Sequence, residues 1–161
     1  FMATKTELQH LRRCVELAEE ALEAGELPFG SVLVAENGTV LFEDYNRASS
    51  GDQTAHPEFE IARWAALNMT PEQRAVATVF TSAEHCAMCS AAHGWVGLGR
   101  ILYVSSSEQL TNWLADLGVP AFPVRTLPIR EVLPNLHTEG PIPGLDEQVH
   151  NLIRRFFSPS K

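Results

Sequence analysis

The chain has 161 residues, of which 45% are hydrophobic, and a formal net charge of −8. Soluble domains typically contain about 100 to 150 residues, so we treat residues 1–161 as one domain. The negative charge opposes binding to phosphate-rich polymers, and no run of about 20 apolar residues is present that would span a bilayer. Because the N-terminus also lacks a signal-peptide pattern, we expect a soluble cytoplasmic protein with no membrane partner.

The first half of the chain predicts a helix, a hairpin and a second helix. Thr4 begins a capping-box pattern and Gly25 is a stop signal, so the first helix should lie between them. Apolar residues 31–35 and 39–42 flank Asn37-Gly38, a sequence typical of a type I′ turn, which predicts a hairpin. A polar loop then leads to a helix from His56 to about Met69.

In the second half, predicted strands alternate with predicted helices. Strands are expected at 75–81 and 100–105, and helices at 86–96 and 108–117, which indicates an α/β fold with a largely parallel, buried sheet. Prolines between 119 and 144 disfavour a long helix there. Apolar spacing over 145–156 predicts a final amphipathic helix, which packs either on the sheet or on a partner subunit.

Two short motifs, His56-Pro57-Glu58 and Cys86-Ala87-Met88-Cys89, carry the predicted chemistry. One histidine and two cysteines are zinc ligands, and three protein ligands leave a coordination position for water, as in catalytic zinc sites. If both helices start at the same edge of the sheet, their N-termini converge and the ligands reach one ion. Glu58 is then the expected general acid/base.

Two other interpretations of these motifs stay open. The first is a packed histidine with a capping glutamate beside an unrelated reduced thiol pair. The second is a purely structural zinc site that another histidine, His85 or His93, completes. The third cysteine, Cys14, lies on the apolar face of the first helix, so we expect a buried thiol there and no ligand.

These motifs resemble the zinc-dependent cytidine/deoxycytidylate deaminase superfamily, which has the signature H-x-E…P-C-x-x-C. The spacing and the Met88-Cys89 ending resemble those of one branch of the superfamily, which contains guanine deaminases, fungal-type cytosine deaminases and tRNA adenosine deaminases. The resemblance covers about residues 7–105 and is carried by residues 28–34, Asn46, 54–58, 81–89 and 99–103.

The resemblance implies the fold, the cofactor and the assembly. It implies a three-layer α/β/α sandwich with a mixed five-stranded sheet. It also implies a homodimer, because proteins of this family are usually dimeric. It assigns one zinc ion per subunit to His56, Cys86 and Cys89, with Glu58 as the catalytic residue. It also implies that Asn46 hydrogen-bonds the substrate ring, and that Phe29 and Ala55 belong to the substrate pocket. A turn residue and a core aromatic are the alternative interpretations of Asn46 and Phe29.

The chain departs from the family pattern at two positions. His85 stands where the family usually has proline, and Pro57 stands where a small residue is usual. His85 is a candidate for contacting substrate or modulating the pH dependence, and a solvent-facing loop histidine is the alternative that we favour. His93, on the Cys86 helix, is expected to be a core or interface histidine.

Beyond residue 105 the resemblance fades, so we divide the domain into a core, 5–118, and a substrate-selecting C-terminal segment, 119–161. Trp113, Asp116 and Glu139 are candidate substrate contacts in the later part of the chain. Their alternative interpretations are a core tryptophan, a surface aspartate and an exposed loop glutamate.

The expected activity is hydrolytic deamination of a small amino-substituted heteroaromatic base: cytosine, guanine, or an azapyrimidine or aminotriazine analogue. The first alternative is a nucleoside or tRNA adenosine/cytidine deaminase, for which residues 154–157 (Arg-Arg-Phe-Phe) offer a small basic-aromatic cluster. The acidic charge argues against nucleic acid as the partner. The second alternative is a non-catalytic zinc-stabilised binding module, against which Glu58 argues.

Overall fold

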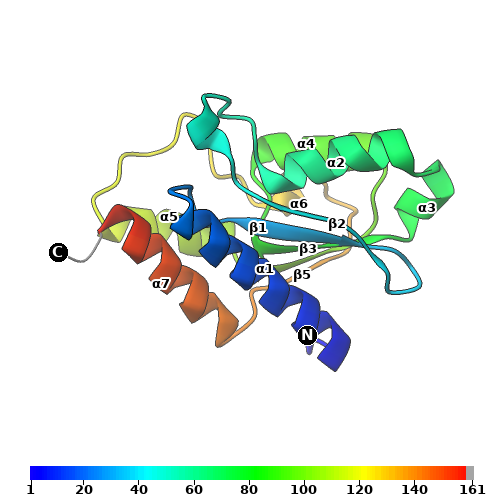
Figure 1. Ribbon diagram of the computed structural model, residues 1–161, viewed down its shortest axis with the longest axis horizontal. Coiled ribbons are helices and arrows are strands. Elements are labelled where there is room, and N and C mark those ends of the chain that lie inside the picture. The colour runs from blue at the N-terminus through cyan, green and yellow to red at the C-terminus, as the bar shows by residue number, and fades with distance from the viewer. Residues whose placement is uncertain (159–161) are drawn as a thin grey trace.

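The computed structural model describes residues 1–158 and has three layers (Figure 1). A five-stranded sheet in the order β2-β1-β3-β4-β5 lies between α1, α5 and α7 on one face and α2, α4 and α6 on the other (Figure 1). The expected α/β/α sandwich is therefore confirmed. The elements are α1 (Lys5–Glu23), β1 (Gly30–Val34), β2 (Val40–Tyr45), η1 (Ala48–Ser50), α2 (Pro57–Asn68), α3 (Pro71–Ala75), β3 (Thr78–Ala83), α4 (Ala87–Val96), β4 (Ile101–Ser105), α5 (Ser107–Asp116), α6 (Ile129–Val132), β5 (Thr138–Glu139) and α7 (Leu145–Phe157).

The sheet is mixed, because a hairpin is joined to a parallel unit. Strand β1 is antiparallel to both β2 and β3. Strands β3, β4 and β5 are parallel to one another, with Thr81 beside Tyr103. Parallel strands end at the same edge of a sheet, so the segments that follow β3 and β4 both begin at this edge. The largely parallel sheet expected from the alternation of elements holds only for β3, β4 and β5.

Two local predictions were wrong. The hairpin turn is not type I′, because that turn needs a positive φ at both central residues and only Gly38 has one, at 91°. The Asn37 side chain instead accepts a hydrogen bond from the Thr39 amide at 3.0 Å. The strand expected from residue 75 begins at Thr78, because Thr70 caps the short helix α3 through a capping box.

Alternate residues of the strands face the two helical layers. Val32 and Phe80 belong to a core cluster with α1 and α7, whereas Leu33 and Val79 belong to a second cluster on the side of α2. The apolar face of α7 is buried in the first cluster, so the final helix packs on the sheet, the first of the two alternatives. Cys14 is buried in this cluster, as expected. Among residues 1–158 no helix is long and apolar enough to cross a membrane.

Close packing of α1 on β1 generates a stability prediction. A Cβ on Gly30 would lie 2.5 Å from the Leu17 Cβ and 2.6 Å from the Cys14 carbonyl oxygen. Both neighbours belong to the rigid body of α1, so Gly30→Ala should reduce the free energy of unfolding by about 1–3 kcal/mol. A Cβ on Gly94 would meet only the flexible side-chain end of Leu133.

Urea unfolding checks this prediction, with Gly94→Ala as the control. We expect the control to keep or raise the midpoint, because alanine favours a helix by about 1 kcal/mol over glycine. An unchanged midpoint for Gly30→Ala would contradict the packing argument.

Candidate functional site

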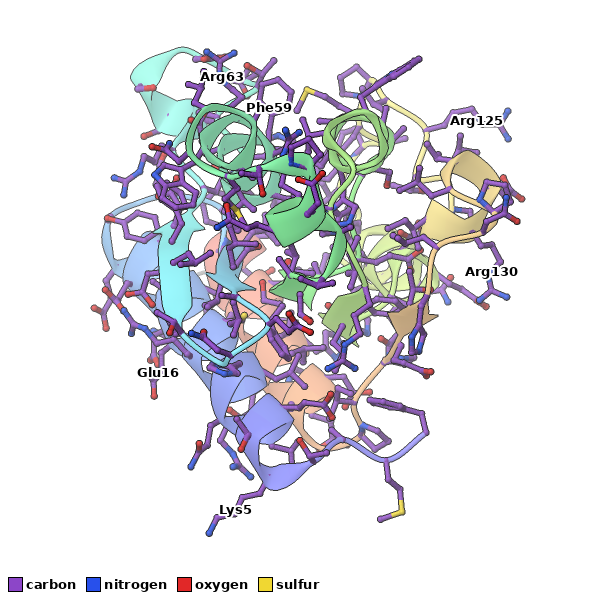
Figure 2. All side chains as sticks on the ribbon, turned by 90° about the vertical axis from the view of Figure 1, so that its right-hand side faces the viewer. Lys5, Glu16, Phe59, Arg63, Arg125 and Arg130 are labelled. Carbon is purple, nitrogen blue, oxygen red and sulfur yellow. The ribbon has the colours of Figure 1, made fainter. Side chains whose placement is uncertain are left out.

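The three predicted ligand residues lie at the N-termini of two neighbouring helices. His56 is the N-cap of α2 and Pro57 occupies the first turn, where a missing N–H costs no helical hydrogen bond. Cys86 is the N-cap of α4, and its Sγ accepts a hydrogen bond from the Cys89 amide at 3.5 Å. Helices α2 and α4 lie side by side above the sheet (Figure 2). The fold therefore brings both motifs to one place, as the sequence predicted.

The spacing of the ligand atoms fits a zinc ion. His56 Nδ1 lies 3.6 Å from the Sγ atoms of both Cys86 and Cys89. For tetrahedral zinc with Zn–N of about 2.0–2.1 Å and Zn–S of about 2.3 Å, the expected N···S separation is about 3.6 Å. One imidazole and two thiols are also a donor set that zinc prefers. No other group of three metal-ligating side chains this close together is found in residues 1–158.

The two thiols have opposite pKa shifts. The hydrogen bond from the Cys89 side chain lowers the pKa of Cys86 to about 4, and the contact with His56 adds to this effect. The same bond, with burial, raises the pKa of Cys89. The contact with Cys86 raises the pKa of His56, against the effect of burial. Of the two thiols, Cys86 is therefore the one whose surroundings favour the thiolate, which is the form of cysteine that binds metals.

Glu58 is a buried carboxylate beside this cluster, only 8% exposed. The Ser31 hydroxyl lies 2.8 Å from its Oε1 atom, and the Thr81 hydroxyl lies 3.3 Å from the same oxygen. Burial raises the pKa of Glu58 to about 7, and the nearby Cys86 charge adds to the rise, while the Ser31 hydrogen bond opposes it. The side chain thus has a fixed orientation and a proton affinity near neutrality.

Ser31 and Thr81 were not anticipated as members of the site. They lie on β1 and β3 at positions that face α2, and their hydroxyls are 2.8 Å apart. Hydroxyl residues within the otherwise apolar strands β1 and β3 are the signal that points to a buried polar partner. The sequence alone does not show that this partner is Glu58.

The residues expected around the substrate occupy several environments. Asn46 is buried and accepts a hydrogen bond from the Ala48 amide at 3.0 Å, which fits the turn interpretation. Phe29 packs against the core cluster under α1, which fits the core interpretation. Ala55 is half-buried next to His56, and its carbonyl accepts from the Arg47 amide at 3.0 Å. Their contacts with substrate stay predictions.

The expectation that His85 is a solvent-facing loop histidine is wrong. Its side chain is 0% exposed, and its ring lies edge-on to the ring of His93 with centroids 5.4 Å apart. The loop before Cys86 is packed against α4, which covers the imidazole. His93 is a buried core histidine, as expected, and its Nε2 lies 2.7 Å from the Gly99 carbonyl oxygen.

The three candidates after residue 105 lie away from Glu58 or at the surface. Trp113 packs against the α1/α7 core cluster, on the opposite face of the sheet, and stacks on His150 at 4.4 Å between ring centroids. Asp116 is exposed, as its alternative interpretation anticipated. Glu139 lies on the edge strand β5, not in a loop, and its Oε1 lies 3.0 Å from His137 Nε2.

Comparison with known proteins agrees with this geometry. The family described as "Cytidine and deoxycytidylate deaminase zinc-binding region" matches residues 4–105. A probable cytosine deaminase from Schizosaccharomyces pombe is 34% identical over 115 residues, which are 71% of this chain and 70% of the relative. A tRNA-specific adenosine deaminase from Agrobacterium fabrum is 35% identical over 158 residues, which are 97% of this chain and 95% of the relative.

A solved structure adds a third relative. The guanine deaminase from Bacillus subtilis has a TM-score of 0.58 and 25% identity, and the alignment covers 96% of each chain. The family match extends from α1 through β4 and therefore contains both motifs of the site. The chain belongs to the cytidine and deoxycytidylate deaminase family of zinc-dependent enzymes.

Proposed function

We propose that this protein hydrolytically deaminates a small amino-substituted heteroaromatic base, such as cytosine, guanine, or an azapyrimidine or aminotriazine analogue, and releases ammonia. His56, Cys86 and Cys89 would hold the zinc ion, and Glu58 would act as general acid/base. The observation that carries the proposal is a buried carboxylate, fixed by two hydroxyls, next to a three-residue nitrogen and sulfur cluster.

Zinc, when bound at this cluster, supplies the Lewis acidity that makes water a nucleophile at neutral pH. Glu58 removes a proton from the attacking water, and water oxygen bonds to the ring carbon that bears the amino group. Glu58 then delivers the proton to the adjacent ring nitrogen. Glu58 next takes the second water proton, from the new hydroxyl group on the ring carbon, and delivers it to the amino group. The C–N bond then breaks, ammonia leaves with its electron pair, and the ring carbon keeps a carbonyl oxygen. Because Ser31 and Thr81 both contact Oε1, we assign the proton transfers to Oε2.

The C-terminal helix supports a small substrate over a nucleic acid. Arg155 forms an ion pair with Glu19 at 3.5 Å. Phe157 packs against the α1/α7 core cluster, and Phe156 contacts it edge-on. Phe157 therefore serves the core of the protein, which leaves less of the basic-aromatic cluster expected at residues 154–157 for stacking on bases. The net charge of −8 also opposes a polynucleotide.

A second candidate keeps the chemistry and changes the substrate to adenosine within tRNA. One observation favours it: the tRNA-specific adenosine deaminase from Agrobacterium fabrum aligns with 97% of this chain. The two candidates differ in the partner that the surface must bind. A tRNA-binding protein should lose affinity steeply as salt increases, because phosphate contacts release counterions.

The proposed function is tested by measuring ammonia from a panel of free bases, nucleosides and tRNA. We expect activity on at least one free base and no salt-sensitive binding of tRNA. Glu58→Gln should lower kcat by at least about 100-fold and leave the zinc content unchanged, since general acid/base groups contribute about 10²- to 10⁴-fold.

The matched control is Glu60→Gln, which removes a carboxylate from the same turn of α2 and should leave the activity unchanged. Activity on tRNA alone would favour the second candidate. If the zinc-loaded protein releases no ammonia from any member of the panel, both candidate functions are contradicted.

The ligand set generates a separate prediction about metal content. Cys86→Ala should lower the bound zinc from one ion per chain to well below one, because zinc-site stability depends on thiolate donors. Cys14→Ala is the control, because it removes a buried thiol that lies among apolar side chains of α1. Elemental analysis after dialysis measures both variants. Full zinc occupancy in Cys86→Ala would show that the ligand set is wrong.

We also propose that the protein is a homodimer joined through the outer faces of α2 and α4. Leu67 on α2 is 83% exposed and Trp95 on α4 is 88% exposed. Met88, Ala91 and Ala92 lie on the same side of α4 as Trp95 by helical spacing, and all three are partly exposed. Exposed contiguous apolar surface of this kind is typical of protein interfaces.

The rest of this face and the position of α7 support the same assignment. Phe59 and Arg63 continue the face along α2 (Figure 2), with the guanidinium carbon 6.0 Å from the ring centroid. The final helix, the other candidate interface, buries its apolar side within its own chain. The outer side of α2 and α4 is therefore the surface that we assign to a second copy of the chain.

Charge at the centre of this face should prevent association. Trp95→Glu should convert the dimer to a monomer, because burying an unpaired carboxylate opposes the contact. Val124→Glu is the control, because it places the same charge at an apolar position that is 51% exposed and lies outside α2 and α4. Light scattering at assay concentration distinguishes the masses. A monomeric wild-type protein, or a dimeric Trp95→Glu variant, would contradict the assignment.

A further inference from the structure

The carboxylate of Glu84 makes contacts that the zinc chemistry does not require. Its Oε1 accepts a hydrogen bond from the Ser107 amide at 2.9 Å. Its Oε2 accepts from the Ile129 amide at 2.6 Å. The Glu84 amide donates to the Ser105 carbonyl at 2.8 Å, which ties the residue to the end of β4. The side chain of this residue thus binds two points on the later part of the chain, and its backbone amide binds a third.

The two amide donors are the first residues of two different helices. Ser107 begins α5 and Ile129 begins α6. Amides in the first turn of a helix have no partner within the helix, so an outside acceptor is needed where they are covered. Ionised carboxylates form hydrogen bonds roughly twice as strong as neutral acceptors. Glu84 therefore fixes the start of α5 and the start of α6 relative to each other.

Glu84 is also attached to the zinc-ligand segment, because Cys86 follows two residues later. Both β3 and β4 end at this edge of the sheet, where α4 and α5 begin. A cavity of about 620 Å³ lies between α5 and the segment 119–131, and Thr111 of α5 contacts Thr126 of that segment at 2.8 Å. Glu84 contacts the first residue of α5 and the first residue of α6, so it joins the two segments whose later and earlier residues line this cavity.

We propose that Glu84 is a positioning residue that sets the C-terminal part of the protein, residues 106–131, at its working distance from the zinc-ligand loop. This rests on the proposed deaminase function and on the expectation that the chain from residue 119, here 119–131, forms the wall that selects the substrate. The role is distinct from that of Glu58: Glu84 accepts hydrogen bonds from backbone amides and acts through the groups that it holds.

The test compares Glu84→Ala with Glu84→Gln in the zinc-loaded protein. Displacing a wall of the site should raise KM about 10- to 100-fold while kcat changes by less than about threefold, because loss of binding made equally in the ground state and the transition state raises KM alone. The zinc content should stay at one ion per chain. Glu84→Gln should give an intermediate KM, because the amide keeps one acceptor oxygen.

Glu108→Ala is the matched control. Glu108 is an exposed carboxylate in the first turn of α5, so its removal changes the charge near the same helix start and spares the Ser107 contact. The control should keep the wild-type KM. A fall in kcat at constant KM in Glu84→Ala, or loss of zinc in Glu84→Gln, would overturn the proposed role.

Hydrogen exchange separates this proposal from the proposed function. In Glu84→Ala the amides of Ser107 and Ile129 should exchange at least about tenfold faster than in the wild type, since each loses its acceptor. This readout needs no substrate. Unchanged exchange at both amides would overturn the role of Glu84 even if deamination is observed. A wild-type protein that is inactive on every base would instead contradict the proposed function. Accelerated exchange in Glu84→Ala would still support the positioning role of Glu84.

Discussion

The site depends on the convergence of two helix N-termini at one edge of the sheet. His56 caps α2 and Cys86 caps α4, so both motifs begin at the positive ends of their helices. The Nδ1 atom of His56 comes within 3.6 Å of both sulfurs only because α2 and α4 pack side by side on the same face. Changes in the packing of these helices would separate the ligands, so the core on this face supports the chemistry directly.

Burial of Glu58 shows how the fold accommodates a carboxylate that stability alone would disfavour. A buried ionisable group is unfavourable unless hydrogen bonds compensate it. Ser31 and Thr81 supply that compensation from two neighbouring strands, and they hold the carboxylate in one orientation. Burial raises the pKa of Glu58 to about 7, and the hydrogen bonds from Ser31 and Thr81 oppose the rise only in part. The strands therefore tune the group as well as support it.

The C-terminal part of the chain serves both the core and the site. Helix α7 buries Val149 and Ile153 against the sheet, so the residues after 118 contribute to the main core. Ile129 of α6 belongs to the core cluster under α2. The exposed residues between these anchors contribute little to the core. The contacts of Glu84 explain how such a segment keeps its position beside the zinc-ligand loop.

Spacing along the chain by itself indicated the candidate ligand set and the helix starts, whereas the mixed-sheet sandwich was implied by the resemblance to the deaminase family. The metal motifs, the Thr4 capping box and the stop at Gly25 are local signals that tertiary packing did not override. Tertiary structure alone decided that His85 is buried and that Ser31 and Thr81 meet Glu58. These contacts join residues 8 or more positions apart in the chain, and which remote side chains meet depends on how strands and helices pack.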